Sequence, residues 1–153
     1  MINPFVLKPH QKWYNYFIGE KKKWAKHVKG GTYRRWYGNI DTVLNISVEA
    51  IKHYREDRVA RFPNENVLFK SGITWNLISS GDLFPMRVLL KDTTFNLAAP
   101  SILFYDPLKI PYVLGFLNSK VSQYFLNVLN PTINTNINNI MNLPVILDKK
   151  KNK

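Results

Sequence analysis

The chain has 153 residues, which fits one compact domain, and its 45% of apolar residues is enough to build a core. It has no cysteine, which excludes disulfides, zinc ribbons and thiol nucleophiles and suits a cytoplasmic location. Lys and Arg number 22 against 10 Asp and Glu. The net charge of +12 favours nucleic acid as the partner over an anionic membrane surface. No apolar run approaches the roughly 20 residues that span a bilayer.

The N-terminal third combines aromatic and basic residues. Residues 1–12 are expected to be irregular, and residues 13–37 interleave eight aromatic side chains with seven Lys and Arg. Gly30-Gly31 predicts a turn within this stretch. Apolar and β-branched residues predict a strand over 41–48, and a charged face predicts a helix over 49–61, which Pro63 ends.

The rest of the chain predicts several strands and one long helix. A short apolar run covers 67–69, and strands are predicted at 73–79, 83–90, 95–97, 101–105 and 143–146. The helix covers 111–129, because its apolar residues recur at spacings of three and four. These residues are Val113, Leu114, Leu117, Val121, Tyr124, Phe125 and Val128.

Together these elements predict an α+β fold. We expect a single domain over residues 1–147, with a mixed or antiparallel sheet and one long amphipathic helix near the C-terminus. A basic tail follows at 148–153.

The sequence carries no recognisable catalytic motif. His10, His27 and His53 lack the spacing that places two metal ligands on one helix face, and the scarce acidic residues do not cluster as a metal-dependent nuclease requires. The segment Asn130–Ile133 comes nearest to the Asn-Pro-Pro-Tyr motif that holds a flipped base, but it lacks the second Pro and the aromatic residue. We therefore expect no metal site and no methylation by this chain alone.

Several strings of residues carry a resemblance to a known family. They are Lys29–Asn39 (KGGTYRRWYGN), Gly72–Gly81 (GITWNLISSG), Leu114–Val121 (LGFLNSKV), Asn130–Thr132 and Asn142–Val145. In this order they resemble the C-terminal portion of the adenine-specific DNA methyltransferases of BREX phage-defence systems, the PglX family. They are also similar to specificity domains of type IIG restriction–modification enzymes. The resemblance covers roughly residues 13 to 147.

The resemblance implies a target-recognition domain without its catalyst. In the family an upstream Rossmann-like domain binds S-adenosylmethionine and flips adenine, so no cofactor is expected in this chain. The implied partners are double-stranded DNA, a methyltransferase catalytic domain or subunit, and other phage-defence proteins, with no membrane. The chain would be an excised part of an enzyme, the product of a disrupted gene or a subunit of a split enzyme.

Twelve residues are predicted to contact DNA. Glycines allow backbone N–H groups to approach a phosphate, Arg forks onto phosphate or guanine, and an aromatic ring stacks on a base. Tryptophan is more often a core residue, as Trp36 could be. An Asn that follows Gly, as Asn39 does, is more often a turn residue than a partner of adenine. Hydroxyl contacts are expected from Thr74, Ser79 and Ser80, and phosphate contacts from Arg87 and Lys91. The remaining predicted contacts come from Lys29, Gly30, Gly31, Arg34, Arg35, Trp36 and Asn39.

Three other functions compete with this interpretation. The first is a general nucleic-acid-binding module whose basic and aromatic side chains stack single strands. The second is a small metal-dependent nuclease. The third is a non-functional remnant or a protein-interaction domain.

Overall fold

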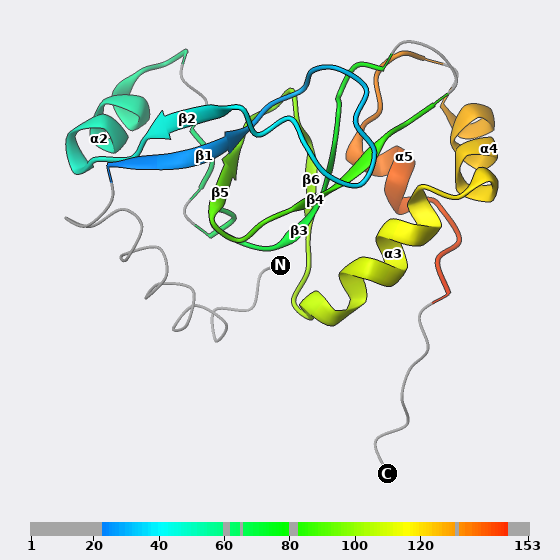
Figure 1. Cartoon of the computed structure of the whole chain (residues 1–153). Coiled ribbons are helices and arrows are strands. Elements are labelled where there is room, and N and C mark those ends of the chain that lie inside the picture. The colour runs from blue at the N-terminus through cyan, green and yellow to red at the C-terminus, as the bar shows by residue number, and fades with distance from the viewer. Residues whose placement is uncertain (1–22, 60–61, 65, 80–82, 131, 147–153) are drawn as a thin grey trace.

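Two small sheets form the centre of the protein (Figure 1). The computed structural model describes residues 23–59, 62–64, 66–79, 83–130 and 132–146. In the first sheet, β1 (Trp24–Val28) runs antiparallel to β2 (Thr42–Asn45) and parallel to β5 (Thr93–Phe95). In the second sheet, β3 (Gly72–Trp75) runs antiparallel to both β4 (Met86–Leu89) and β6 (Ser101–Leu103), so β4 is an edge strand.

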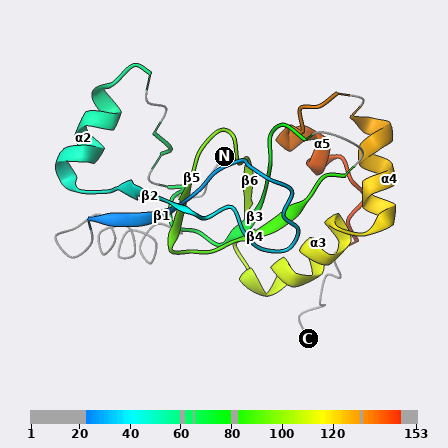
Figure 2. The ribbon, with the colours of Figure 1, turned by 45° about the horizontal axis from the view of Figure 1, so that its top comes forward.

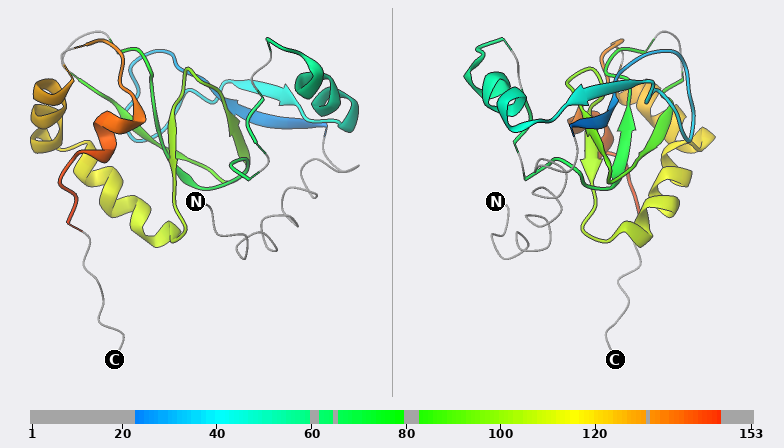
Figure 3. Two further views of the ribbon diagram at one scale, coloured as in Figure 1. Left: turned by 180° about the vertical axis from the view of Figure 1, so that it is seen from behind. Right: turned by 60° about the vertical axis from the view of Figure 1, so that its left-hand side comes forward.

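The helices lie at the two ends of the molecule. They are α2 (Val48–Glu56), the 3-10 helix η2 (Pro107–Lys109), α3 (Ile110–Leu117), α4 (Lys120–Leu129) and α5 (Ile137–Met141). Helix α2 lies beyond the first sheet, and α3, α4 and α5 lie together beside the second, as the views from the front, above and behind agree (Figures 1, 2 and 3). This confirms the predicted α+β class. Of the helices in the described segments, none is long and apolar enough to cross a membrane.

The main core lies between the second sheet and the C-terminal helices. Ile73, Trp75 and Met86 from the strands pack with apolar residues of α3, α4 and α5. A second cluster joins β1 to α2, and a third, small one contains Val28, Leu89 and Ala99. Since successive residues of a strand point to opposite faces, Met86 faces the helices while Arg87 and Leu89 face away from them.

The predicted helix over 111–129 is wrong, because the chain forms two helices that break at Asn118-Ser119. Ser119 has extended backbone angles and caps α4, and its Oγ accepts a hydrogen bond from the Ser122 N–H at 3.2 Å. The break changes which residues of α4 face the core. Leu126, Ser122 and Gln123 are buried, while four members of the predicted stripe are exposed, namely Val121, Tyr124, Phe125 and Val128.

Other predictions succeeded in part. The strands predicted over 41–48, 73–79, 83–90 and 101–105 are confirmed with shorter bounds, the one at 95–97 is shifted to Thr93–Phe95, and the helix over 49–61 is α2. The strand predicted at 143–146 is wrong, since these residues form no strand, and α5 in the Asn-rich stretch was missed. Residues 1–12, Ser80 and the tail 148–153 lie outside the described residues.

Candidate nucleic-acid interface

The connection between β1 and β2, residues 29–41, forms a basic–aromatic loop that crosses the second sheet (Figure 1). Trp36 pairs with Arg87 in a parallel bridge at the outer edge of β4. The Trp36 N–H donates to the Met86 carbonyl at 2.9 Å, and the Val88 N–H donates to the Trp36 carbonyl at 2.9 Å. The loop therefore occupies part of the open edge of β4 and is held there by backbone hydrogen bonds.

Two asparagines close the base of the loop. The Asn76 side chain donates to the Gly31 carbonyl at 2.7 Å. The Asn39 side chain donates to the Thr32 carbonyl at 3.0 Å and lies 3.5 Å from the Asn76 Oδ1. Asn39 also has a positive φ of 56°, so it serves as a turn residue and its amide nitrogen is engaged within the loop. The sequence analysis missed Asn76, although its position directly after the buried strand β3 was a signal for it.

Gly30 is required by close packing. A Cβ atom at this position would lie 2.6 Å from the carbonyl oxygen of Ala98, so any other residue would displace the backbone of one of the two segments. Gly30-Gly31, predicted as a turn, forms neither a turn nor a bend and is instead the place where the loop touches the segment before β6. This contact and the two asparagines fix both ends of the loop.

Trp36 lies at the centre of a tight three-residue turn. The Tyr37 N–H donates to the Arg35 carbonyl at 3.0 Å, and the φ of Trp36 is 76°. These features define a γ-turn whose central residue has positive φ, a rare and strained conformation. Strain of this kind costs about 1–3 kcal/mol and persists only where the surroundings enforce it. Here the two hydrogen bonds to β4 enforce it.

The turn presents aromatic and cationic side chains to solvent. Trp36 is 49% exposed, against the commoner core position for tryptophan, and Tyr33 and Tyr37 are 52% and 54% exposed. Arg34 and Lys29 are exposed as well. Arg35 is half-buried, and its Nε has no hydrogen-bond partner among the described residues. Flat rings beside cationic groups suit a polyanion that also offers aromatic faces.

Arg87 and Thr74 lie beneath the surface. The Thr74 hydroxyl donates to the Pro100 carbonyl at 3.0 Å, which employs it within the fold. The Arg87 side chain is fully buried, and within the described part of the chain none of its three nitrogens has a hydrogen-bond partner. Burial lowers the pKa of Arg87 to about 10. Arg87, predicted to clamp a phosphate, instead places a positive charge inside the domain, as the bridge partner of Trp36.

The other predicted contact residues lie away from the turn. Ser79 is buried, and its N–H donates to the Ile133 carbonyl at 3.0 Å. Lys91 is exposed and follows β4 at the end away from Met86. The structure therefore brings together the predicted residues between Lys29 and Asn39, and separates Ser79 and Lys91 from them.

A buried histidine, His27, lies next to the start of the loop. The Nδ1 of His27 is 2.8 Å from the Thr94 hydroxyl, which itself donates to the Lys26 carbonyl at 3.2 Å. His27 Nδ1 is therefore the donor to Thr94. Burial, and then the charge of Lys29, lowers the pKa of His27 below 6.5. Among the described residues no group of three His, Asp or Glu side chains could hold a metal ion.

Two side-chain amides, those of Asn118 and Gln123, bind the backbone at and just before the start of β4. The Asn118 Oδ1 accepts from the Met86 N–H at 3.1 Å, and its Nδ2 donates to the Met86 carbonyl at 3.0 Å. Gln123 makes the same pair of bonds to Phe84, at 2.7 and 3.0 Å. Met86 thus links the helix break to Trp36, whose N–H it also accepts.

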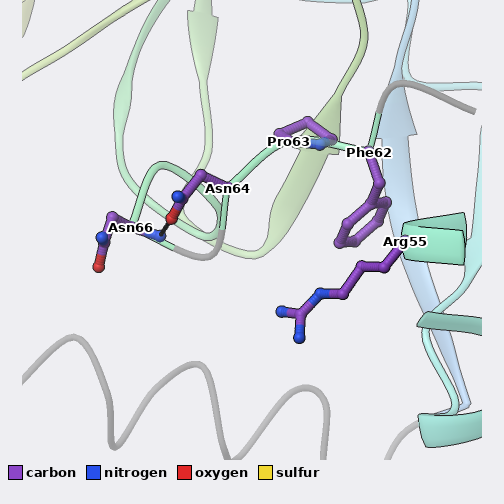
Figure 4. A pocket seen from close by; sticks show the side chains of 5 residues that line it. All are labelled: Arg55, Phe62, Pro63, Asn64 and Asn66. Atoms are coloured by element: carbon purple, nitrogen blue, oxygen red, sulfur yellow. Dashed lines mark hydrogen bonds between the residues drawn. The ribbon is translucent and has the colours of Figure 1, made fainter. Parts of the chain in front are cut away.

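A polar pocket of about 330 Å³ lies elsewhere, beside α2 (Figure 4). Arg55 reaches from α2 beneath Phe62, and the Asn66 N–H donates to the Asn64 Oδ1 at 2.9 Å. No residue predicted to contact DNA lines this pocket. The basic–aromatic loop is consequently the better candidate site.

Comparison with known proteins places this arrangement in context. The chain is 35% identical over 147 residues to the adenine-specific methyltransferase PglX of Lacticaseibacillus casei (strain Zhang), and 30% identical over 126 residues to the adenine-specific methyltransferase BrxX of Escherichia coli O9:H4 (strain HS). No protein-family model matches it. The alignments cover 92% and 81% of this chain but 12% and 10% of the two methyltransferases. Over most of its length the chain is therefore similar to about a tenth of each of two adenine-specific methyltransferases.

Proposed function

We propose that this chain is a DNA-recognition domain of a BREX-type adenine-specific DNA methyltransferase and that it transfers no methyl group itself. One observation carries the proposal: the basic–aromatic loop is fixed to β4 through its backbone, while its aromatic and cationic side chains remain exposed. Rigid backbone and exposed side chains suit a surface that must fit a duplex without reordering. S-adenosylmethionine and the catalytic residues belong to another domain or subunit, which is the expected partner.

Each part of the loop has a physical role in this proposal. Lys29 and Arg34 neutralise phosphates, which gives affinity and position without sequence information. Arg34 and Arg35 also have the planar fork that pairs with the guanine edge in the major groove. Arg87 lies beneath the surface, so it adds to the positive field without touching DNA.

The test measures DNA binding by the 153-residue chain with fluorescence anisotropy at increasing salt concentrations. Changing Arg34→Ala together with Arg35→Ala should weaken duplex binding by about tenfold and reduce the slope of log affinity against log salt by about 1, because the phosphate contact of Arg34 is lost. The control, Lys52→Ala with Arg58→Ala, removes the same charge at exposed positions in and after α2. It should change affinity by less than about threefold.

The outcomes separate the competing functions. Equal losses in both double variants would mean that the loop is not the interface and that only net charge matters. Single strands bound as tightly as duplex would favour the general nucleic-acid-binding module. Cleavage of DNA on addition of Mg²⁺ would favour the nuclease.

A further inference from the structure

Trp36 is held in a way that packing does not explain. Its backbone has the strained positive φ of 76°, yet its side chain is 49% exposed, so packing within the chain leaves about half of it in contact with solvent. The same loop uses a glycine, Gly38, where φ reaches 131°. A glycine at position 36 would relieve the strain in the same way. An indole ring at a strained position therefore points to a contact outside the chain.

The support beneath Trp36 fixes the backbone from which its ring projects. Its N–H and carbonyl are both bonded to β4, and Met86, which accepts its N–H, is bonded in turn to the buried Asn118. The support runs through backbone groups and one buried amide, so the ring is carried by the second sheet rather than by a mobile loop tip. A ring positioned in this way can enter a narrow space without losing much conformational freedom.

The surroundings of Trp36 indicate what the ring contacts. Tyr33 and Tyr37 are exposed on either side, and Arg34 is exposed between them. Indole stacks well on a nucleobase, but within a duplex the base faces are covered by their neighbours. A base face becomes available where a nucleotide leaves the stack, and enzymes that modify a base withdraw it from the duplex. The two relatives carry the name of adenine-specific methyltransferases.

We propose that Trp36 inserts into the DNA base stack at the position that a withdrawn base leaves, and so holds the duplex open. Apolar side chains inserted between base steps act in this way in other proteins that deform DNA. The inference rests on the proposed function, because it requires that the loop faces a duplex. It assigns the loop a second task besides recognition: stabilising the state in which the base is out.

The test compares two duplexes of about 20 base pairs that differ at one central position. One is intact, and the other carries an abasic site, which is a permanent vacancy in the stack. The full 153-residue chain should bind the vacancy duplex about tenfold more tightly than the intact one. Trp36→Ala should remove this preference, so that it binds the two duplexes equally, while Trp36→Phe should keep most of the preference because it keeps a ring.

Trp24→Ala is the matched control. Trp24 is 54% exposed but lies on β1, outside the loop, so its loss should leave the preference unchanged. A preference that survives in Trp36→Ala, or a wild-type chain that binds both duplexes equally, would overturn the inference while leaving the proposed function intact. Failure of the wild-type chain to bind either duplex would overturn both. Should Trp36→Ala fail to fold, Trp36→Phe and wild-type tryptophan fluorescence replace it in the test. Stronger quenching of this fluorescence by the vacancy duplex than by the intact duplex would support the inference, and equal quenching would overturn it.

Discussion

Replacing Arg87 by methionine is expected to stabilise the protein. The guanidinium is fully buried, and among the described residues it has no hydrogen-bond partner. Burial lowers its pKa to about 10. A shift of this size corresponds to about 3 kcal/mol of preference against the charged form in the folded state. The folded protein therefore holds a charge that disfavours folding at neutral pH.

The expected gain follows from this cost. Methionine is flexible enough to fill the space of the Arg87 stem, and it removes the charge and the unsatisfied N–H groups. The free energy of unfolding at pH 7 should rise by about 1–3 kcal/mol, and the melting temperature by roughly 3–10 °C. Because the folded-state pKa lies below the unfolded-state value, the destabilisation is fully present below pH 10 and declines only as the pH rises above 10 toward the unfolded-state pKa. A measurement at pH 7 thus records the whole effect.

Urea unfolding followed by circular dichroism and tryptophan fluorescence measures the change. Arg87→Lys keeps a positive charge and should bring no gain, and Arg58→Met, at an exposed position, should change stability by less than about 0.5 kcal/mol. The reasoning would be refuted if Arg87→Met lost more than about 1 kcal/mol with an unchanged dependence on urea. That result would show that the guanidinium is paired in solution.

Two further predictions concern buried polar groups. Asn118→Ala leaves the Met86 N–H without its acceptor and should lower stability by about 2–3 kcal/mol, whereas the exposed Asn138→Ala should lower it by less than about 0.5 kcal/mol, both measured by urea unfolding. For His27, whose folded pKa is below 6.5, the unfolded chain binds the proton first, so stability should fall as the pH is lowered from 7 through 6.5 to 5. Thermal melts at these pH values should show a smaller fall for His27→Gln, and an identical fall would contradict this assignment.

The fold class could be predicted because the pattern of apolar residues is local. In β4, Met86, Val88 and Leu89 form a short apolar run, and such a run is typical of a buried strand. The helix break at Asn118 was missed because the apolar spacing continues across it, even though Ser119 is a favoured capping residue. β1 was missed because its buried residues include Ala25 and His27, which give a weak apolar signal.

The sequence predicted which segment forms the candidate site, but it did not predict which of the site's side chains are buried. The run from Lys29 to Asn39 does form one exposed surface loop, since Gly30 and the flanking polar residues favour a turn locally. The burial of Arg87 depends on segments distant in the sequence, such as the one that pairs with it through Trp36, and a contact between segments about 50 residues apart leaves no periodic trace in either of them. The γ-turn at Trp36 likewise depends on the edge of β4.

The exposed face of α4 should make the protein associate in sulfate salts, a response opposite to the one expected of its Lys and Arg side chains. Val121, Tyr124 and Val128 are 59%, 67% and 62% exposed, so one side of the helix offers apolar surface to the solvent. Sulfate salts strengthen apolar association, whereas raised ionic strength releases Lys and Arg from phosphates. Concentrated sulfate that strips nucleic acid from the chain during purification should therefore drive the molecules together through α4. Dilute chloride buffers should keep the chains dispersed while the proposed complexes with DNA persist.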